Sequence, residues 1–144
     1  MLELLRRLMA PEPSRLPDPD ARLALAALLV RIARTDGLYA AEEVERIDRV
    51  LALRHGLDPF AAARLRAEAE ALEAEAPDTV RFTRALKDAV ALEDRAELMV
   101  ALWSIALADG LREVNEDRLM RLVANLLGLT DVDSALARQK AERA

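Results

Sequence analysis

The amino-acid sequence predicts an all-α fold of about seven to eight helices. Its composition leans on Ala, Leu, Arg and Glu, which lose little side-chain entropy in a helix. No window alternates apolar and polar residues with period two, as a half-buried strand would. Helix start and stop signals recur along the chain. The 144 residues are the length of one ordinary domain and are enough to enclose a hydrophobic core.

The chain divides into an N-terminal segment, residues 1–19, and a helical domain, residues 20–144. The apolar residues of the segment fall on one face of a short predicted helix. They are Leu2, Leu4, Leu5, Leu8 and Met9. Pro11–Pro19 then forms a stiff linker. The short helix could dock on the core, join a second subunit in a homodimer, or rest on a membrane surface. Docking is favoured, because two arginines are too few for firm electrostatic anchoring.

Start and stop signals place the helices of the domain. The expected spans are 20–35, 41–55, 59–76, 77–91, 95–108, 116–127 and 132–142. Asp20 caps the first of these, and Gly37 ends it. Gly56 ends the second. Asp58 before Pro59 combines a cap residue with a proline at the first helical position, which is a strong start signal.

The later helices are bounded in the same way. Asp94, with Glu97 three residues on, predicts a capping box at the start of the helix over 95–108. That helix is apolar nearly all round in its second half, so we expect it to be the buried central element, with Trp103 in the core and its indole N–H needing one partner. Thr130 or Asp131 caps the last helix.

Composition and charge exclude several classes of function. The absence of cysteine excludes disulfides and Cys-based zinc sites, and a single histidine, His55, excludes paired-histidine metal centres. A net charge of −5, with arginines interleaved among acids, argues against nucleic acid as a partner. Residues 1–10 lack the uninterrupted apolar stretch of a signal peptide, and the longest apolar run is about half the ~20 residues of a membrane helix. We therefore expect a cytoplasmic protein.

The chain contains an internal repeat. Residues 32–43 read I-A-R-T-D-G-L-Y-A-A-E-E, and residues 105–116 read I-A-L-A-D-G-L-R-E-V-N-E. At an offset of 73 residues, the Asp-Gly-Leu triplet and the Glu that follows it coincide without a gap. The repeat predicts two pseudo-symmetric helix–Asp-Gly–helix hairpins around a common core.

The repeated acids are candidate metal ligands. Asp36 and Asp109 each continue an apolar stripe and sit at a helix C-terminus, where the helix dipole disfavours negative charge by up to ~1 kcal/mol. Glu43 and Glu116 begin the following helices. If the hairpins pack corner to corner, these four carboxylates could converge on calcium, magnesium or manganese, which prefer oxygen ligands. Alternatively, each Asp accepts backbone N–H groups and each Glu only caps its helix.

An ordinary EF-hand is excluded. The Asp-Gly pair and the later Glu match the second half of an EF-hand loop, but the first and third ligand positions do not carry carboxylates. These positions fall on Ile32 and Arg34 in one copy, and on Ile105 and Leu107 in the other.

Together these features resemble the TerB family of tellurite-resistance proteins. The resemblance rests on both Asp-Gly-Leu motifs with their Glu, and on the tail L-V-A-N-L-L-G-L-T-D-V-D-S-A-L-A-R, and it covers the chain from about Asp20 onward. It implies an all-helical, internally pseudo-symmetric protein associated with tellurite resistance and stress response. By resemblance, Asp36, Glu43, Asp109 and Glu116 inherit the metal-binding role proposed for the family's paired acids.

The leading functional hypothesis is a non-enzymatic, metal-binding or metal-responsive module that acts through protein partners in a stress response. The alternative is a protein-interaction scaffold in which the acids are purely structural. A metal-dependent hydrolase is the least favoured reading, because no nucleophile–base pair, Gly-rich phosphate loop or group of histidines accompanies the carboxylates.

Overall fold

The computed structural model describes residues 20–35, 39–75, 78–108 and 114–143, with the side chains of residues 114–116 left out. Seven α-helices make up this part of the chain. They are α2 (Ala21–Ala33), α3 (Ala41–His55), α4 (Pro59–Glu75), α5 (Val80–Ala89), α6 (Arg95–Ala106), α7 (Val114–Leu126) and α8 (Asp131–Arg143), with a short 3-10 helix, η1 (Leu92–Asp94), before α6. No strand occurs within these residues, so the all-α prediction is confirmed. The helix expected over residues 2–9 lies outside them.

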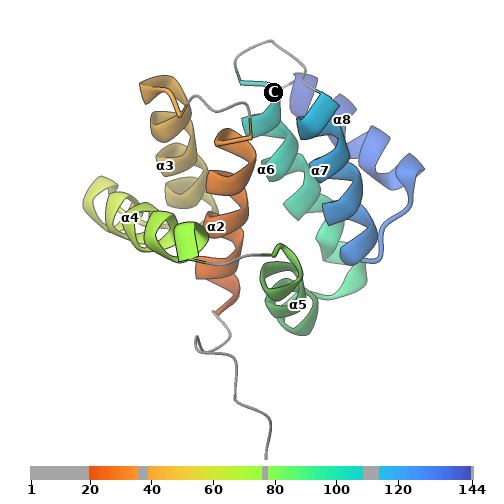
Figure 1. Ribbon diagram of the computed structural model, residues 1–144, viewed down its shortest axis with the longest axis horizontal. Helices are drawn as coiled ribbons and strands as arrows, with labels where there is room; N and C mark the ends of the chain where they lie inside the picture. The colour runs from red at the N-terminus through yellow and green to blue at the C-terminus, as the bar shows by residue number, and fades with distance from the viewer. Residues whose placement is uncertain (1–19, 36–38, 76–77, 109–113, 144) are drawn as a thin grey trace, which may run out of the picture.

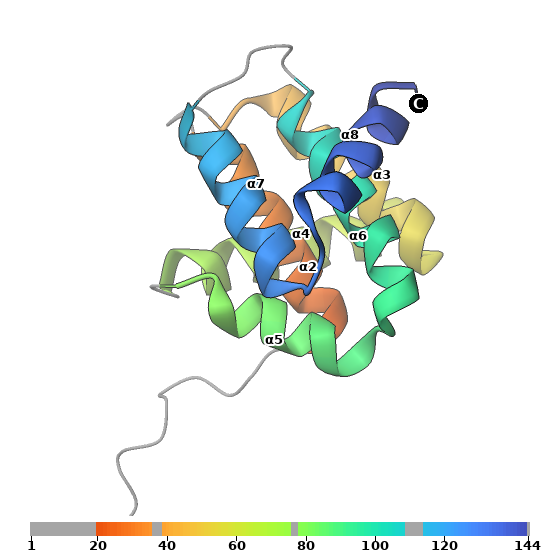
Figure 2. The ribbon, with the colours of Figure 1, turned by 90° about the vertical axis from the view of Figure 1, so that its right-hand side faces the viewer.

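Helix α2 is the central element of the fold (Figures 1 and 2). Nine of its 13 residues are buried. It packs against α4, α5 and α6, and more lightly against α3 and α7. The sequence led us to expect this role for α6. That helix does bury Leu98, Leu102 and Trp103, but the small and apolar residues all round α2 allow neighbours to approach it on every side.

The internal repeat extends to a third helix in each copy. Helix α2 packs chiefly against α4, and α6 packs chiefly against α8, while α5 and η1 connect the two units. The turns before the third helices match, because Gly56 and Gly128 both have a positive φ, 62° and 78°. The repeated unit is therefore α2–α3–α4 and α6–α7–α8, which is longer than the hairpin that the sequence showed.

Most helix starts follow the predicted signals. The Oδ1 atom of Asp20 accepts the Leu23 N–H at 2.8 Å, and Asp58 Oδ1 accepts the Ala61 N–H at 2.8 Å. Thr130 is the cap of α8, since its Oγ1 accepts the N–H of Asp133 at 3.0 Å, and the Asp133 carboxylate accepts the Thr130 N–H at 3.0 Å. This reciprocal pair is a capping box formed with Asp in place of Glu.

The capping box predicted at Asp94 is wrong. Asp94 has φ −96° and ψ −10° and makes no capping hydrogen bond from its side chain. Because η1 runs directly into α6, Asp94 is already in a helical conformation and cannot adopt the extended backbone of an N-cap. None of the described helices is long and apolar enough to cross a membrane.

Candidate metal centre at the Asp-Gly-Leu corners

The first Asp-Gly-Leu corner joins α2 to α3. Asp36, Gly37 and Leu38 lie outside the described residues, but the residues on either side of them are placed. The guanidinium of Arg34, at the end of α2, lies 5.1 Å from the centroid of the Tyr39 ring, just before α3. This cation–π contact joins the residues on either side of the corner and holds its two ends together.

Glu43 is the one predicted ligand whose side chain is described. It is only 7% exposed, and its Oε1 accepts the N–H of Ala40 at 3.3 Å. The carboxylate therefore turns back and caps the first turn of α3. Helix capping is the role that the alternative to metal binding predicts for this residue. A carboxylate has about four acceptor sites, so the same side chain can cap a helix and bind a metal ion.

The other three predicted ligands are not tested by the structure. Asp36 and Asp109 lie outside the described residues, as does the side chain of Glu116. Within the described ranges, no group of three or more His, Asp or Glu side chains could hold a metal ion. The predicted donor set consists of carboxylate oxygens, and its chemistry fits a hard divalent cation.

Glu73 of α4 holds Arg31 of α2 and Arg34, the residue that follows α2. Its Oε2 lies 2.7 Å from an Nη of Arg34, and its Oε1 lies 3.3 Å from Nε of Arg31. Arg31 also donates to the Thr79 hydroxyl and stacks over the Phe82 ring at 5.1 Å. The Glu73 side chain is only 13% exposed. Glu73 therefore contributes to the packing of α4 against α2 rather than to a solvated face.

A second charged cluster joins α3 to α4. Arg66 donates through Nε to Asp48 at 2.6 Å and through an Nη to Glu70 at 2.9 Å. The hydrogen bond to Asp48 raises the pKa of Arg66. Burial raises the pKa of the Tyr39 hydroxyl well above its usual value, and the neighbouring Glu70 carboxylate raises it further. Tyr39 therefore stays protonated, and the Glu70 carboxylate beside it is paired with Arg66.

His55 ends α3. Its Nε2 is buried and makes no hydrogen bond with any residue that the structure describes. Burial lowers the pKa of His55, and the charges of Arg22 and Arg54 lower it further. The ring is therefore neutral at pH 7.

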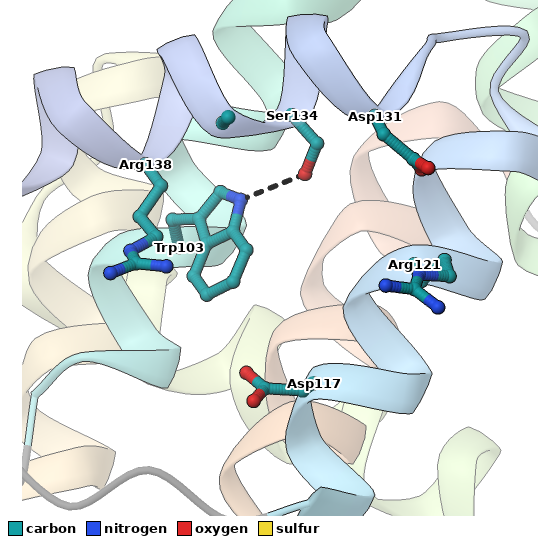
Figure 3. A pocket seen from close by; sticks show the side chains of 7 residues that line it. Trp103, Asp117, Arg121, Asp131, Ser134 and Arg138 are labelled. Carbon is teal, nitrogen blue, oxygen red and sulfur yellow. Dashed lines mark hydrogen bonds between the residues drawn. The ribbon is translucent and has the colours of Figure 1, made fainter.

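Sequence reasoning missed a pocket in the second copy. The pocket has a volume of about 230 Å³ and lies between α7 and α8 (Figure 3). Its lining includes Trp103, Arg121 and Arg138. Trp103 was correctly expected in the core, and its Nε1 donates to Ser134 Oγ at 3.1 Å. The two arginines could have been found by aligning the two copies beyond the Asp-Gly-Leu motif.

Comparison with known proteins agrees with the resemblance seen in the sequence. The model of one protein family, described as tellurite resistance protein TerB, matches residues 22–139. The match runs from α2 into α8 and includes both Asp-Gly-Leu motifs. No match was found among curated proteins or among solved structures. The family match covers most of the chain, and the chain therefore belongs to the tellurite-resistance TerB family.

Proposed function

We propose that this chain is a non-enzymatic TerB module that binds a divalent cation at its Asp-Gly-Leu corners and acts through protein partners in tellurite resistance or stress response. The observation that carries the proposal is the orientation of Glu43. Its buried carboxylate turns back to the N–H of Ala40, four residues after Asp36 in the sequence. A carboxylate with little access to water is stabilised by donors or a cation.

The charged clusters around the corner support a binding role over a catalytic one. Glu73 is neutralised by Arg31 and Arg34, and Asp48 by Arg66. In these pairs the carboxylate oxygens are held by arginine side chains of the protein rather than presented to a substrate. These clusters instead fix α2 and α3 against α4, which holds the two ends of the corner in place.

Calorimetric titration of the full chain with calcium, magnesium, manganese and zinc tests the proposal. We expect saturable binding of a hard cation, and loss of that binding in Asp36→Asn and Asp109→Asn. Asp88→Asn is the matched control, because Asp88 is an exposed acid on α5, remote in sequence from both corners. Absence of binding, or equal binding by the double Asp36→Asn/Asp109→Asn variant, would contradict the proposal.

The second candidate, a protein-interaction scaffold, is favoured by two exposed apolar side chains. Leu53 is 81% exposed near the end of α3, and Phe60 is 90% exposed at the start of α4. Large side chains this exposed on both sides of one turn are candidate contact residues for a partner. If this candidate is correct, Leu53→Ser/Phe60→Ser abolishes a native complex that Asp36→Asn leaves intact.

A screen with general phosphatase and esterase substrates tests the remaining alternative, a hydrolase. We expect no turnover. Metal-dependent turnover that disappears in Asp36→Asn would establish an enzyme and overturn the non-catalytic assignment.

A further inference from the structure

The two copies of the repeat differ where their second and third helices meet. In the first copy, Arg66 of α4 pairs with Asp48 of α3 at 2.6 Å and with Glu70 of its own helix at 2.9 Å. The Asp48 carboxylate therefore joins α3 to α4. The corresponding place in the second copy lies between α7 and α8.

Arg138 of α8 is the counterpart of Arg66. Each arginine lies eight residues after the residue that caps its helix, Asp58 for α4 and Thr130 for α8. Each also pairs with the glutamate one turn later, and the Nε of Arg138 lies 2.9 Å from Glu142. The two arginines thus share both position and intrahelical partner.

The counterpart of Asp48, however, is another arginine. At the 73-residue offset of the Asp-Gly-Leu motif, Asp48 corresponds to Arg121 of α7. The same offset aligns pairs of fully buried core residues, which supports this register. These pairs are Ile47 with Met120 and Leu51 with Ala124. A carboxylate that bridges two helices in the first copy is therefore replaced by a cation in the second.

The pocket of about 230 Å³ lies at this place (Figure 3). The Arg138 guanidinium lies 5.7 Å from the centroid of the Trp103 ring, and its side chain is 33% exposed. Figure 3 shows Arg138 reaching from α8 toward the indole, with Arg121 and Asp117 projecting from α7. Asp131, at the start of α8, also lines the pocket.

We propose that this pocket binds a carboxylate group, which occupies the place that Asp48 holds in the first copy. Guanidinium groups bind carboxylates with paired, charge-assisted hydrogen bonds, and Glu142 and Trp103 already orient Arg138. The indole provides an apolar wall for the carbon atoms of the ligand. Asp117 and Asp131 reduce the positive charge of the pocket, so it favours a single carboxylate over a phosphate dianion.

The carboxylate can belong to a free organic acid or to an acidic side chain of a protein partner. Arg121 is exposed, so water and salt screen its charge and the affinity for a free acid is on the order of millimolar. Neither source requires the divalent cation proposed for the corners. The two proposals can therefore fail independently.

Trp103 is the only tryptophan of the chain and reports directly on the pocket. The test is a fluorescence titration of the full chain at constant ionic strength, in buffer freed of divalent ions. The ligands are acetate, glutamate, phosphate and chloride, with N-acetyl-aspartate amide and its asparagine analogue representing a partner side chain. We expect saturable changes with the carboxylates, tighter than with phosphate and absent with chloride and the asparagine compound.

Variants locate the binding site. Arg138→Gln and Arg121→Gln should each weaken carboxylate binding about tenfold, while the control Arg64→Gln, which removes an exposed arginine of α4, leaves it unchanged. Arg121→Asp restores the Asp48–Arg66 arrangement. It should keep the melting temperature at or above the original and abolish binding, because its own carboxylate fills the site.

Four results would overturn the proposal. They are no saturable change with any of the carboxylates, an equal response to chloride, tighter binding of phosphate than of every carboxylate, and carboxylate binding that persists in a folded Arg121→Asp variant. If glutamate and N-acetyl-aspartate amide both bind, the site accepts a carboxylate from either source. If only the aspartate amide binds, the natural ligand is a protein side chain.

Discussion

Glu73 and Arg34 illustrate how a single charged contact can serve both stability and the candidate site. Arg34 lies two residues before Asp36, where its positive charge could compete with a cation for the carboxylate. The Glu73 carboxylate holds the guanidinium at 2.7 Å, and the Tyr39 ring covers it. Glu73 thereby neutralises Arg34 while anchoring α2 to α4.

Replacing Glu73 with Gln should lower the free energy of unfolding by about 2 kcal/mol, because it removes the carboxylate that Arg31 and Arg34 share in a largely buried place. Glu68→Gln removes an exposed acid from the same helix and should change stability by less than about 0.5 kcal/mol. Urea denaturation followed by circular dichroism measures both. Equal effects of the two substitutions would show that the pairing of Glu73 with Arg31 and Arg34 does not stabilise the fold.

His55 should make stability depend on pH near neutrality. Its pKa is lower in the folded protein than the usual 6.5, so the unfolded chain binds the proton more readily. The stabilisation is present above pH 6.5 and is lost as the pH falls toward the folded-state pKa. The melting temperature should therefore fall as the pH is lowered from 7.5 to 5.5. His55→Gln should make the melting temperature depend less on pH over this range. If the melting temperature of His55→Gln changes with pH as steeply as that of the original protein, other titrating groups control the pH dependence.

At the scale of single helices, local signals predicted most ends because a cap depends on a few neighbouring residues. Asp20, Asp58 and Thr130 act as expected. The signal at Asp94 failed because the preceding residues already form η1, which depends on how α5 is joined to α6. The pairing of Glu73 with Arg31 and Arg34 could not be predicted either, because these arginines lie about forty residues away in the sequence.

The contrast between Asp58 and Asp94 gives a matched test of capping. Asp58→Ala should cost about 1 kcal/mol, since it leaves the Ala61 N–H without its acceptor. Asp94→Ala should cost less than about 0.5 kcal/mol, because Asp94 makes no capping bond from its side chain. Thermal denaturation of both variants measures the difference. A larger loss in Asp94→Ala would contradict the structure at the start of α6.

At the scale of the whole molecule, α2 connects the two copies because it packs against helices of both. The sequence predicted the duplication and the family, but not the central helix, because apolar composition does not say which of two apolar helices the others surround. The metal site remains a prediction, with Glu43 as its one described ligand. The pocket was not predicted because it depends on a difference between the copies, Arg121 in place of Asp48. A search for repeated motifs finds only the residues that the copies share.

Because α2 is common to both units, the protein should unfold in a single step. Leu29→Ala in α2 and Leu102→Ala in α6 occupy equivalent, fully buried positions, and each should cost about 2–5 kcal/mol. In each variant, Trp103 fluorescence and circular dichroism should give the same denaturation midpoint. If Leu29→Ala melts by circular dichroism before Trp103 responds, the first copy unfolds on its own.

The central position of α2 also has a consequence for synthesis of the protein on the ribosome. This helix is made before all the helices that cover it, and α6 and α7 follow it by some seventy to ninety residues. Its apolar surface must stay exposed on the nascent chain until those helices emerge. We expect chaperones that recognise apolar segments to contact residues 24–33 of ribosome-bound chains that end before α6, and to release them once α7 has been translated.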